Sequence, residues 1–255
     1  MGLLFHPITT LSLKLASVFL FVLLVSAGLF GNPDPVHNLA PTFVWVIWWV
    51  GLAYVSAFLG DIWSLINPWK IIFSWVETAW SRMNSGQTLR PIFQYPANWG
   101  TWPALVLFLM FAWVENVYGD SVIPSRISQM IIIYSGITWL GMFLFGKETW
   151  VRHGETFSIA FGFLAKFAPI GKPRTQNKTT DPELPPTPQD SLSQQQLILR
   201  PFGSGLIDME RVSTSQMLFV LSLLATVTFD GFTGTLPWLN IQAWVQETLP
   251  NPTLV

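Results

Sequence analysis

Hydrophobic residues gather in long runs along this chain, and breaks rich in Gly, Pro and charged residues separate the runs. Five runs predict membrane-spanning helices, because a bilayer core of about 30 Å requires about 20 mostly apolar residues per helix. They cover residues 11–30, 41–60, 101–119, 128–146 and 215–232. We therefore predict an all-α fold, a polytopic integral membrane helix bundle in which residues 1–255 form a single transmembrane domain with interfacial amphipathic helices.

Two further segments have the pattern of helices at a membrane surface. Within 61–80, apolar residues recur every three or four positions, which predicts one apolar helical face. Pro68 should kink or restart that helix, with Asn67 as its cap. The segment 157–170 is apolar but short, and we expect a helix that lies in the membrane surface or dips into it. The alternative that 157–170 spans the membrane stays open.

Positive charge is distributed unevenly between the two sides that five spans would define. Of the 13 Lys and Arg residues, all except Arg126 fall on the side of the N-terminus and the two long loops. The positive-inside rule places that side in the cytoplasm. The segment 172–196, rich in Pro, Thr, Gln and Asn, cannot bury a core and is predicted to be a flexible cytoplasmic loop.

The first run has a second interpretation, as a signal peptide cleaved after the small residues Val25, Ser26 and Ala27. Against it, the N-terminal region of such a signal peptide would be long, with Lys14 as its only Lys or Arg. We expect the run to be retained as a span. Its removal would leave the predicted orientation of the other spans unchanged.

Composition supports a membrane protein and excludes several kinds of site. Hydrophobic residues make up 51% of the chain and charged residues 11%, against about 25% charged in soluble domains. The 14 Trp and 20 Phe residues suit the membrane–water boundary. A net charge of −1 gives no reason to expect a nucleic-acid partner. The absence of cysteine excludes disulfides, thiolate metal sites and cysteine nucleophiles.

Two predicted spans each carry a carboxylate, Glu115 and Asp230, at a matching depth of about fifteen residues. A charge in hydrocarbon costs at least about 2.5–3.5 kcal/mol, so such a group usually faces a partner, a cavity or a substrate path. Both acids are therefore candidate catalytic residues. Gly and Thr residues follow Asp230, and their flexibility and hydroxyl groups favour a functional interpretation. The alternative is that both acids cap helix ends near the interface.

A second set of candidates lies at the opposite face in the five-span arrangement. Asp61 lies at the start of the amphipathic segment, where a carboxylate can cap a helix, and that role competes with catalysis. His153 and Glu155 are two residues apart, without the i, i+4 spacing of a helical zinc motif, so they are a weak metal signal and candidates for acid–base chemistry. These three residues cannot share a site with Glu115 and Asp230 in this topology. If 157–170 spans, Asp230 moves to the side of Asp61 and His153.

Several short motifs follow one another along the chain, and their shared order is more specific for a protein family than any one motif. They are Gly60-Asp61-Ile62-Trp63, Asn67-Pro68-Trp69, Trp99-Gly100-Thr101-Trp102-Pro103-Ala104, Phe111-Ala112-Trp113-Val114-Glu115, Leu144-Phe145-Gly146 with Trp150, Glu155-Thr156-Phe157-Ser158, Ala168-Pro169 and Phe229-Asp230-Gly231. With these the chain resembles a family of bacterial polytopic membrane proteins that carries the name fenitrothion hydrolase, the membrane subunit of an organophosphorus hydrolase. The likeness extends from the second span onward.

The resemblance implies a location in the bacterial inner membrane and cleavage of the aryl ester of an organophosphorus triester. It brings no catalytic residue set with it. We expect relatives to continue with further spans after the Asp-Gly motif. Paired carboxylates could bind a divalent metal or activate water directly. The alternative is a transporter with an acidic relay, or a structural subunit of a membrane complex, whose partners are the lipid bilayer and a second membrane subunit.

Overall fold

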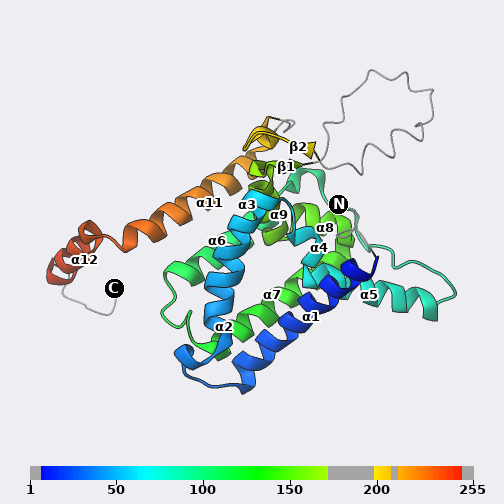
Figure 1. Ribbon diagram of the computed structural model, residues 1–255, viewed down its shortest axis with the longest axis horizontal. Helices are drawn as coiled ribbons and strands as arrows, with labels where there is room; N and C mark the ends of the chain where they lie inside the picture. The colour runs from blue at the N-terminus through cyan, green and yellow to red at the C-terminus, as the bar shows by residue number, and fades with distance from the viewer. Residues whose placement is uncertain (1–6, 172–197, 208–211, 249–255) are drawn as a thin grey trace.

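The structure is a computed structural model that describes residues 7–171, 198–207 and 212–248 of the chain (Figure 1). Apart from one short antiparallel strand pair, the regular elements in these ranges are helical. The longer helices are α1 (Pro7–Phe30), α3 (Leu52–Leu59), α5 (Pro68–Met83), α6 (Trp102–Asn116), α7 (Pro124–Phe145), α8 (Lys147–His153), α9 (Thr156–Leu164), α11 (Thr214–Thr233) and α12 (Leu236–Thr248). The π-helix η2 (Thr42–Gly51) precedes α3. The short elements are η1 (Pro35–His37), α2 (Leu39–Pro41), α4 (Trp63–Ile66), η3 (Ala97–Trp99), η4 (Ala165–Phe167), β1 (Ile170–Gly171), β2 (Ile198–Leu199) and η5 (Ser204–Leu206).

The prediction of an all-α fold is confirmed for the described residues. Five helices are long and apolar enough to cross a membrane, and they cover Ile8–Phe30, Leu39–Leu59, Ala97–Asn116, Pro124–Phe145 and Thr214–Thr233. Each coincides with a predicted run. The boundaries differ by a few residues because local capping decides them. For example, Pro124 occupies the first turn of α7, and Ser213 forms a capping box with Gln216 at the start of α11.

The break predicted at Asn67 and Pro68 is present. α4 ends at Ile66, and α5 begins at Pro68, whose missing N–H costs nothing in a first helical turn. The side chain of Asn67 accepts a hydrogen bond from the backbone N–H of Lys70 over 3.1 Å, which is the predicted cap. The predicted amphipathic segment 61–80 is therefore two helices with a change of direction between them.

α9, with η4 beyond it, forms the short apolar helix expected near 157–170, and it lies inside the bundle. Phe157 and Phe161 are buried in a cluster of aromatic rings that includes Trp48, Trp49 and Trp63. α9 contacts α3, α4, α6 and α8. A helix lying flat on the outside of the bundle would not have these contacts, so the packing favours the form that dips inward. Its depth in a membrane stays a prediction.

α1 packs closely against α7. A Cβ added at Gly28 would come within 2.5 Å of the carbonyl oxygen of Pro124, so only glycine permits this approach. The hydroxyl of Ser128 donates to the carbonyl of Val25 over 3.1 Å across the same crossing. In the structure α1 is therefore packed on α7 as one helix of the bundle.

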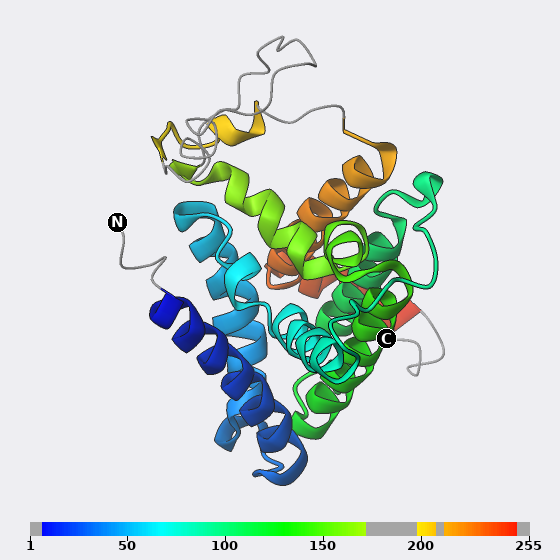
Figure 2. The same cartoon turned by 90° about the vertical axis from the view of Figure 1, so that its right-hand side faces the viewer.

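The bundle has two ends (Figure 2). The strand pair β1–β2, in which Ile170 pairs with Leu199, lies at one end, and the turn that follows α1 lies at the other. α11 begins beside the strand pair and leads away to α12, which stands apart from the other helices (Figure 1). The predicted loop 172–196 lies outside the described residues.

Candidate functional site

α6 and α11 are neighbouring helices that start in contact. The backbone N–H and the side-chain hydroxyl of Thr101 both donate to Oγ of Ser215, each over 3.0 Å. Further along, the rings of Phe108 and Phe219 lie 5.1 Å apart. The two helices therefore run in the same direction from a shared starting point, and residues at similar distances from that point lie at similar depths.

This pairing brings Glu115 and Asp230 to the same end of the two helices. They are near enough for their charges to interact. Glu115 is partly buried, whereas Asp230 is exposed. The structure thus brings together the two acids for which the sequence predicts the same depth in their spans.

The surroundings of Asp230 differ from what its sequence context suggests. α11 continues through Gly231 to Thr233, and a Cβ at Gly231 would have open space around it, so the flexibility that glycine permits here is not used. The hydroxyl of Thr233 donates to the backbone carbonyl of Asp230 over 2.8 Å, and that of Thr235 donates to the carbonyl of Phe232 over 2.7 Å. These hydroxyls satisfy the helix end instead of binding a carboxylate.

Glu155 has a different environment from the acid pair, because its side chain is fully buried at the N-terminus of α9. Five donors reach its two oxygens: the hydroxyl of Tyr134 at 2.6 Å, the backbone N–H groups of Ser158 at 2.7 Å and Phe157 at 3.1 Å, Nδ2 of Asn67 at 3.2 Å and Nε1 of Trp63 at 3.4 Å. A buried carboxylate with this many donors is stabilised where it is. Its geometry indicates a positioning role that joins α4, α7 and α9.

His153 and Glu155 have different contacts, although only one residue separates them. His153 is the last residue of α8, and its ring stacks on that of Tyr95 with centroids 5.3 Å apart. Burial, with the positive charge of Arg152 beside it, lowers the pKa of His153. The two side chains therefore do not form the acid–base or metal-binding pair that the sequence suggested.

Asp61 is exposed and acts as a local cap. Its Oδ1 accepts a hydrogen bond from the backbone N–H of Ser64 over 3.1 Å, and the Ser64 hydroxyl donates to the Asp61 carbonyl over 2.8 Å. This geometry favours the capping interpretation over catalysis. Asp61 also lies in the wall of a cleft beside α9 and α11.

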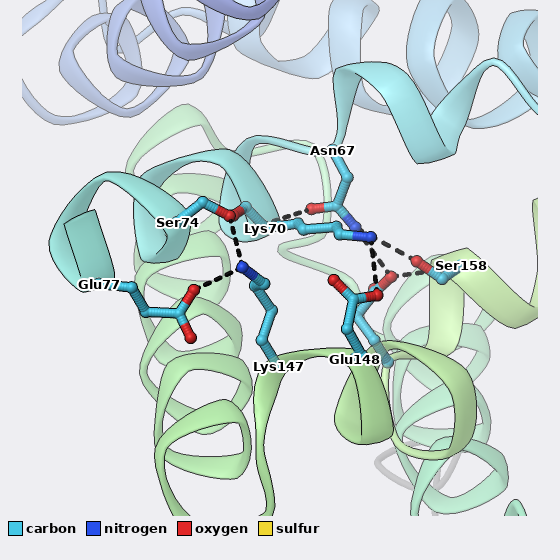
Figure 3. Close-up of polar contacts among 8 residues, drawn as sticks. Asn67, Lys70, Ser74, Glu77, Lys147, Glu148 and Ser158 are labelled. Atoms are coloured by element: carbon cyan, nitrogen blue, oxygen red, sulfur yellow. Dashed lines mark hydrogen bonds and ion pairs between the residues drawn. The ribbon is translucent and has the colours of Figure 1, made fainter. Parts of the chain in front are cut away.

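Two ion pairs fasten α5 to α8 (Figure 3). Nζ of Lys70 lies 3.0 Å from Oε2 of Glu148, and Nζ of Lys147 lies 2.5 Å from Oε2 of Glu77. Lys147 also donates to the hydroxyl of Ser74 over 3.0 Å. Each helix contributes one lysine and one glutamate, so this contact between the two helices is charge-balanced.

An apolar cleft of about 530 Å³ opens between α1, η2, α5, α6 and α7. Trp45, Trp69, Met110 and Ile133 are among the residues in its wall, and Tyr134 also faces it. Such a cleft suits an apolar ligand. Val114 lines it, whereas neither Glu115 nor Asp230 is among its lining residues, so the cleft and the acid pair are separate features of α6.

In the described part of the chain, no three His, Cys, Asp or Glu side chains gather in a group that could hold a metal ion. Glu115 and Asp230 supply two carboxylates, fewer than the three protein ligands usual at a catalytic zinc. The residues present thus do not form a complete protein cage for a metal. We derive no chemical step through one.

Sequence reasoning missed Tyr134. A tyrosine within an apolar run is typical of the membrane interface, and nothing local to it indicates a buried carboxylate partner 21 residues later. Only the packing of α7 against α9 shows the pair.

Comparison of the chain with protein-family models, with curated proteins and with solved structures finds no match.

Proposed function

We propose that the chain is a multi-pass membrane protein with its N-terminus in the cytoplasm. The five apolar helices and the placement of all but one of the 13 Lys and Arg residues on one side support this arrangement. Because the chain has no cysteine, a single introduced thiol reports only its own position. A membrane-impermeant maleimide applied to intact cells should label Val122→Cys, between α6 and α7, and should spare Gln87→Cys, which follows α5.

Labelling of Gln87→Cys, with protection of Val122→Cys, would reverse the orientation. Both positions are exposed in the structure, so a difference between them would report the membrane and not burial in the protein. Labelling of both positions after the cells are opened is the control for thiol reactivity.

We propose that this membrane protein is a hydrolase that cleaves the aryl ester of an organophosphorus triester, as the resemblance implies. The observation that supports a reactive centre is the approach of Glu115 to Asp230 at the outer ends of α6 and α11. Two interacting carboxylates from separate helices can hold and deprotonate one water molecule.

The proposed reaction uses these two side chains and water. The water oxygen attacks phosphorus, the bond between phosphorus and the aryl oxygen breaks, and the phenolate leaves. Glu115, the less exposed acid, takes the proton of the attacking water, and Asp230 accepts a hydrogen bond from the same water and orients it. The apolar cleft on α6 is a separate feature and is not assigned to this step.

Phenolate release from dimethyl 4-nitrophenyl phosphate by the full-length protein in lipid vesicles tests this proposal. Glu115→Gln and Asp230→Asn should each lower kcat by about 10²–10⁴-fold, the usual contribution of general base catalysis. Asp120→Asn is the matched control: it removes a carboxylate in the loop after α6, outside the pair, and should keep the wild-type rate. Equal rates in all four proteins would refute the assignment.

One observation favours a second candidate function, a subunit of a larger membrane assembly. The outer half of α11 carries exposed apolar residues, including Val227 and Phe232, beside the exposed Asp230. A carboxylate in hydrocarbon is unfavourable unless it meets a polar partner. A subunit or transporter would lose assembly or coupled uptake in Asp230→Asn, and it would have no hydrolysis to lose.

A further inference from the structure

A second cleft, of about 580 Å³, lies between α4, α8, α9 and the first turns of α11. Asp61, Arg152, Lys166 and Gln216 give it a polar part, and Phe163 and Leu221 belong to its apolar part. It is therefore amphipathic, unlike the apolar cleft beside α1. In chain order it lies just after the second span and at the beginning of the fifth, which is the cytoplasmic end of the proposed topology.

Its two cations are without ion-pair partners among the residues that the structure describes. The ion pairs in those residues join His37 to Asp34, Lys70 to Glu148 and Lys147 to Glu77. Arg152 and Lys166 take part in none of them. Lys70 on α5 and Lys147 on α8, the helix that also carries Arg152, are both paired.

Among the residues that the structure describes, Asp61 is the one carboxylate in the wall of this cleft, and one of its oxygens already accepts the N–H of Ser64. Two cations and one carboxylate give the described wall of the cleft a formal charge of +1. The cleft therefore attracts an anion, while its apolar part favours a ligand with a hydrocarbon portion.

We propose that this cleft binds the phosphate of a membrane amphiphile, an anionic phospholipid of the cytoplasmic leaflet. The phosphate meets Arg152 and Lys166, since guanidinium and ammonium groups are the usual protein partners of phosphate oxygens. One acyl chain lies along Phe163 and Leu221. Basic pockets between spanning helices on the cytoplasmic side bind phospholipid head groups in this way. The inference rests on the proposed membrane placement and is independent of hydrolysis.

The test uses the full-length protein purified in a neutral detergent and titrated with dioctanoyl phosphatidylglycerol, with the thermal unfolding midpoint as the measure of binding. A ligand that binds only the folded state raises this midpoint as its concentration increases. The variant with both Arg152→Gln and Lys166→Gln should require at least about tenfold more lipid for the same rise in the midpoint. A tenfold change corresponds to a loss of about 1.4 kcal/mol of binding free energy. Arg126→Gln, which removes an exposed cation near the start of α7, should respond as the wild type does.

Two further ligands identify the source of the phosphate. Dioctanoylglycerol has the tails without the phosphate, and glycerol phosphate has the phosphate without the tails. The proposal expects neither to raise the unfolding midpoint at concentrations where the intact lipid does. An equal response to dioctanoylglycerol would overturn the role of the cations, and an equal response to glycerol phosphate would indicate a free phosphate site instead of a lipid site.

Failure of the site and failure of the membrane placement give different results. Unchanged affinity in the double variant, with the cysteine labelling pattern as expected, refutes the phosphate site alone. Lipid binding that depends on Arg152 and Lys166, with the labelling pattern reversed, places the same site in the other leaflet and overturns the cytoplasmic assignment. A matching unfolding midpoint of the unliganded double variant and wild type shows that the substitutions do not act through folding.

Discussion

The hydroxyl of Tyr134 donates a hydrogen bond to Oε1 of Glu155 over 2.6 Å, and this contact joins the middle of α7 to the first turn of α9. Two backbone N–H groups of α9 complete the environment on one side, and side chains from α4 and from the break before α5 complete it on the other. The carboxylate therefore fixes how three helices meet at the centre of the bundle.

Tyr134→Phe removes one of the five donors and keeps the ring, which packs 5.1 Å from Phe157 and 5.0 Å from Trp69. We expect it to lower the free energy of unfolding by about 1–2 kcal/mol, the upper range for one hydrogen bond between helices in a membrane protein. Glu155→Ala leaves all five donors without their acceptor and should cost roughly 3 kcal/mol or more. Denaturant unfolding in detergent measures both, and a smaller loss in Glu155→Ala than in Tyr134→Phe would contradict the positioning role.

Gly28 lies where α1 crosses α7, and an added methyl group would collide with Ser128 and the Pro124 carbonyl. We expect Gly28→Ala to destabilise the protein by about 1–3 kcal/mol, because backbone atoms cannot move aside easily. Gly136→Ala is the control, since it lies on α7 itself with open space around it.

A methyl group at position 136 should be neutral or should stabilise the helix by up to about 1 kcal/mol through helix propensity. Thermal unfolding of the two variants in the same detergent provides the comparison. Equal effects at positions 28 and 136 would show that the α1–α7 crossing is not as close as the structure has it.

The two ion pairs between α5 and α8 differ in exposure. The side chains of Lys147 and Glu77 are 18% and 28% exposed, whereas Glu148 in the other pair is 65% exposed. Solvent and salt weaken exposed pairs, so we expect Lys147→Met to lower the free energy of unfolding by up to about 1 kcal/mol and Lys70→Met to have a smaller effect. Unfolding at low and high salt compares the two losses of free energy. A larger loss in Lys70→Met than in Lys147→Met would contradict this prediction.

His153 should contribute a pH dependence to stability. Because its pKa is lowered in the folded protein, the unfolded chain binds the proton more readily. As pH falls through the ordinary titration range of histidine, the unfolded state gains protons first and the free energy of unfolding decreases; below the lowered pKa both states are protonated and the loss is complete. His153→Gln should flatten this slope between about pH 7.5 and 5.5, measured by unfolding at several pH values. A slope unchanged by the substitution would exclude the effect.

The sequence predicted the spans because their length and apolar composition are set by the membrane, and it predicted the break at Asn67 and Pro68 because proline and asparagine act locally. The matching depth of Glu115 and Asp230 followed from counting residues, and the contact of Thr101 with Ser215 gives both helices a common starting point. The role of Glu155 could not be predicted, because three of its five donors, Trp63, Asn67 and Tyr134, reach it only through tertiary packing. The hydroxyls of Thr233 and Thr235 donate hydrogen bonds to backbone carbonyls, because the last turn of a helix has carbonyl oxygens without an N–H partner in the helix.

Glu115 and Asp230 are proposed to act as one reactive unit. A double-mutant cycle on hydrolysis of dimethyl 4-nitrophenyl phosphate tests it most directly, with Glu115→Gln, Asp230→Asn and the double variant in lipid vesicles. Residues that act as a unit are non-additive, so the double variant should be no slower than the slower single variant. Rate losses that multiply in the double variant, or hydrolysis that none of the substitutions affects, would contradict the claim.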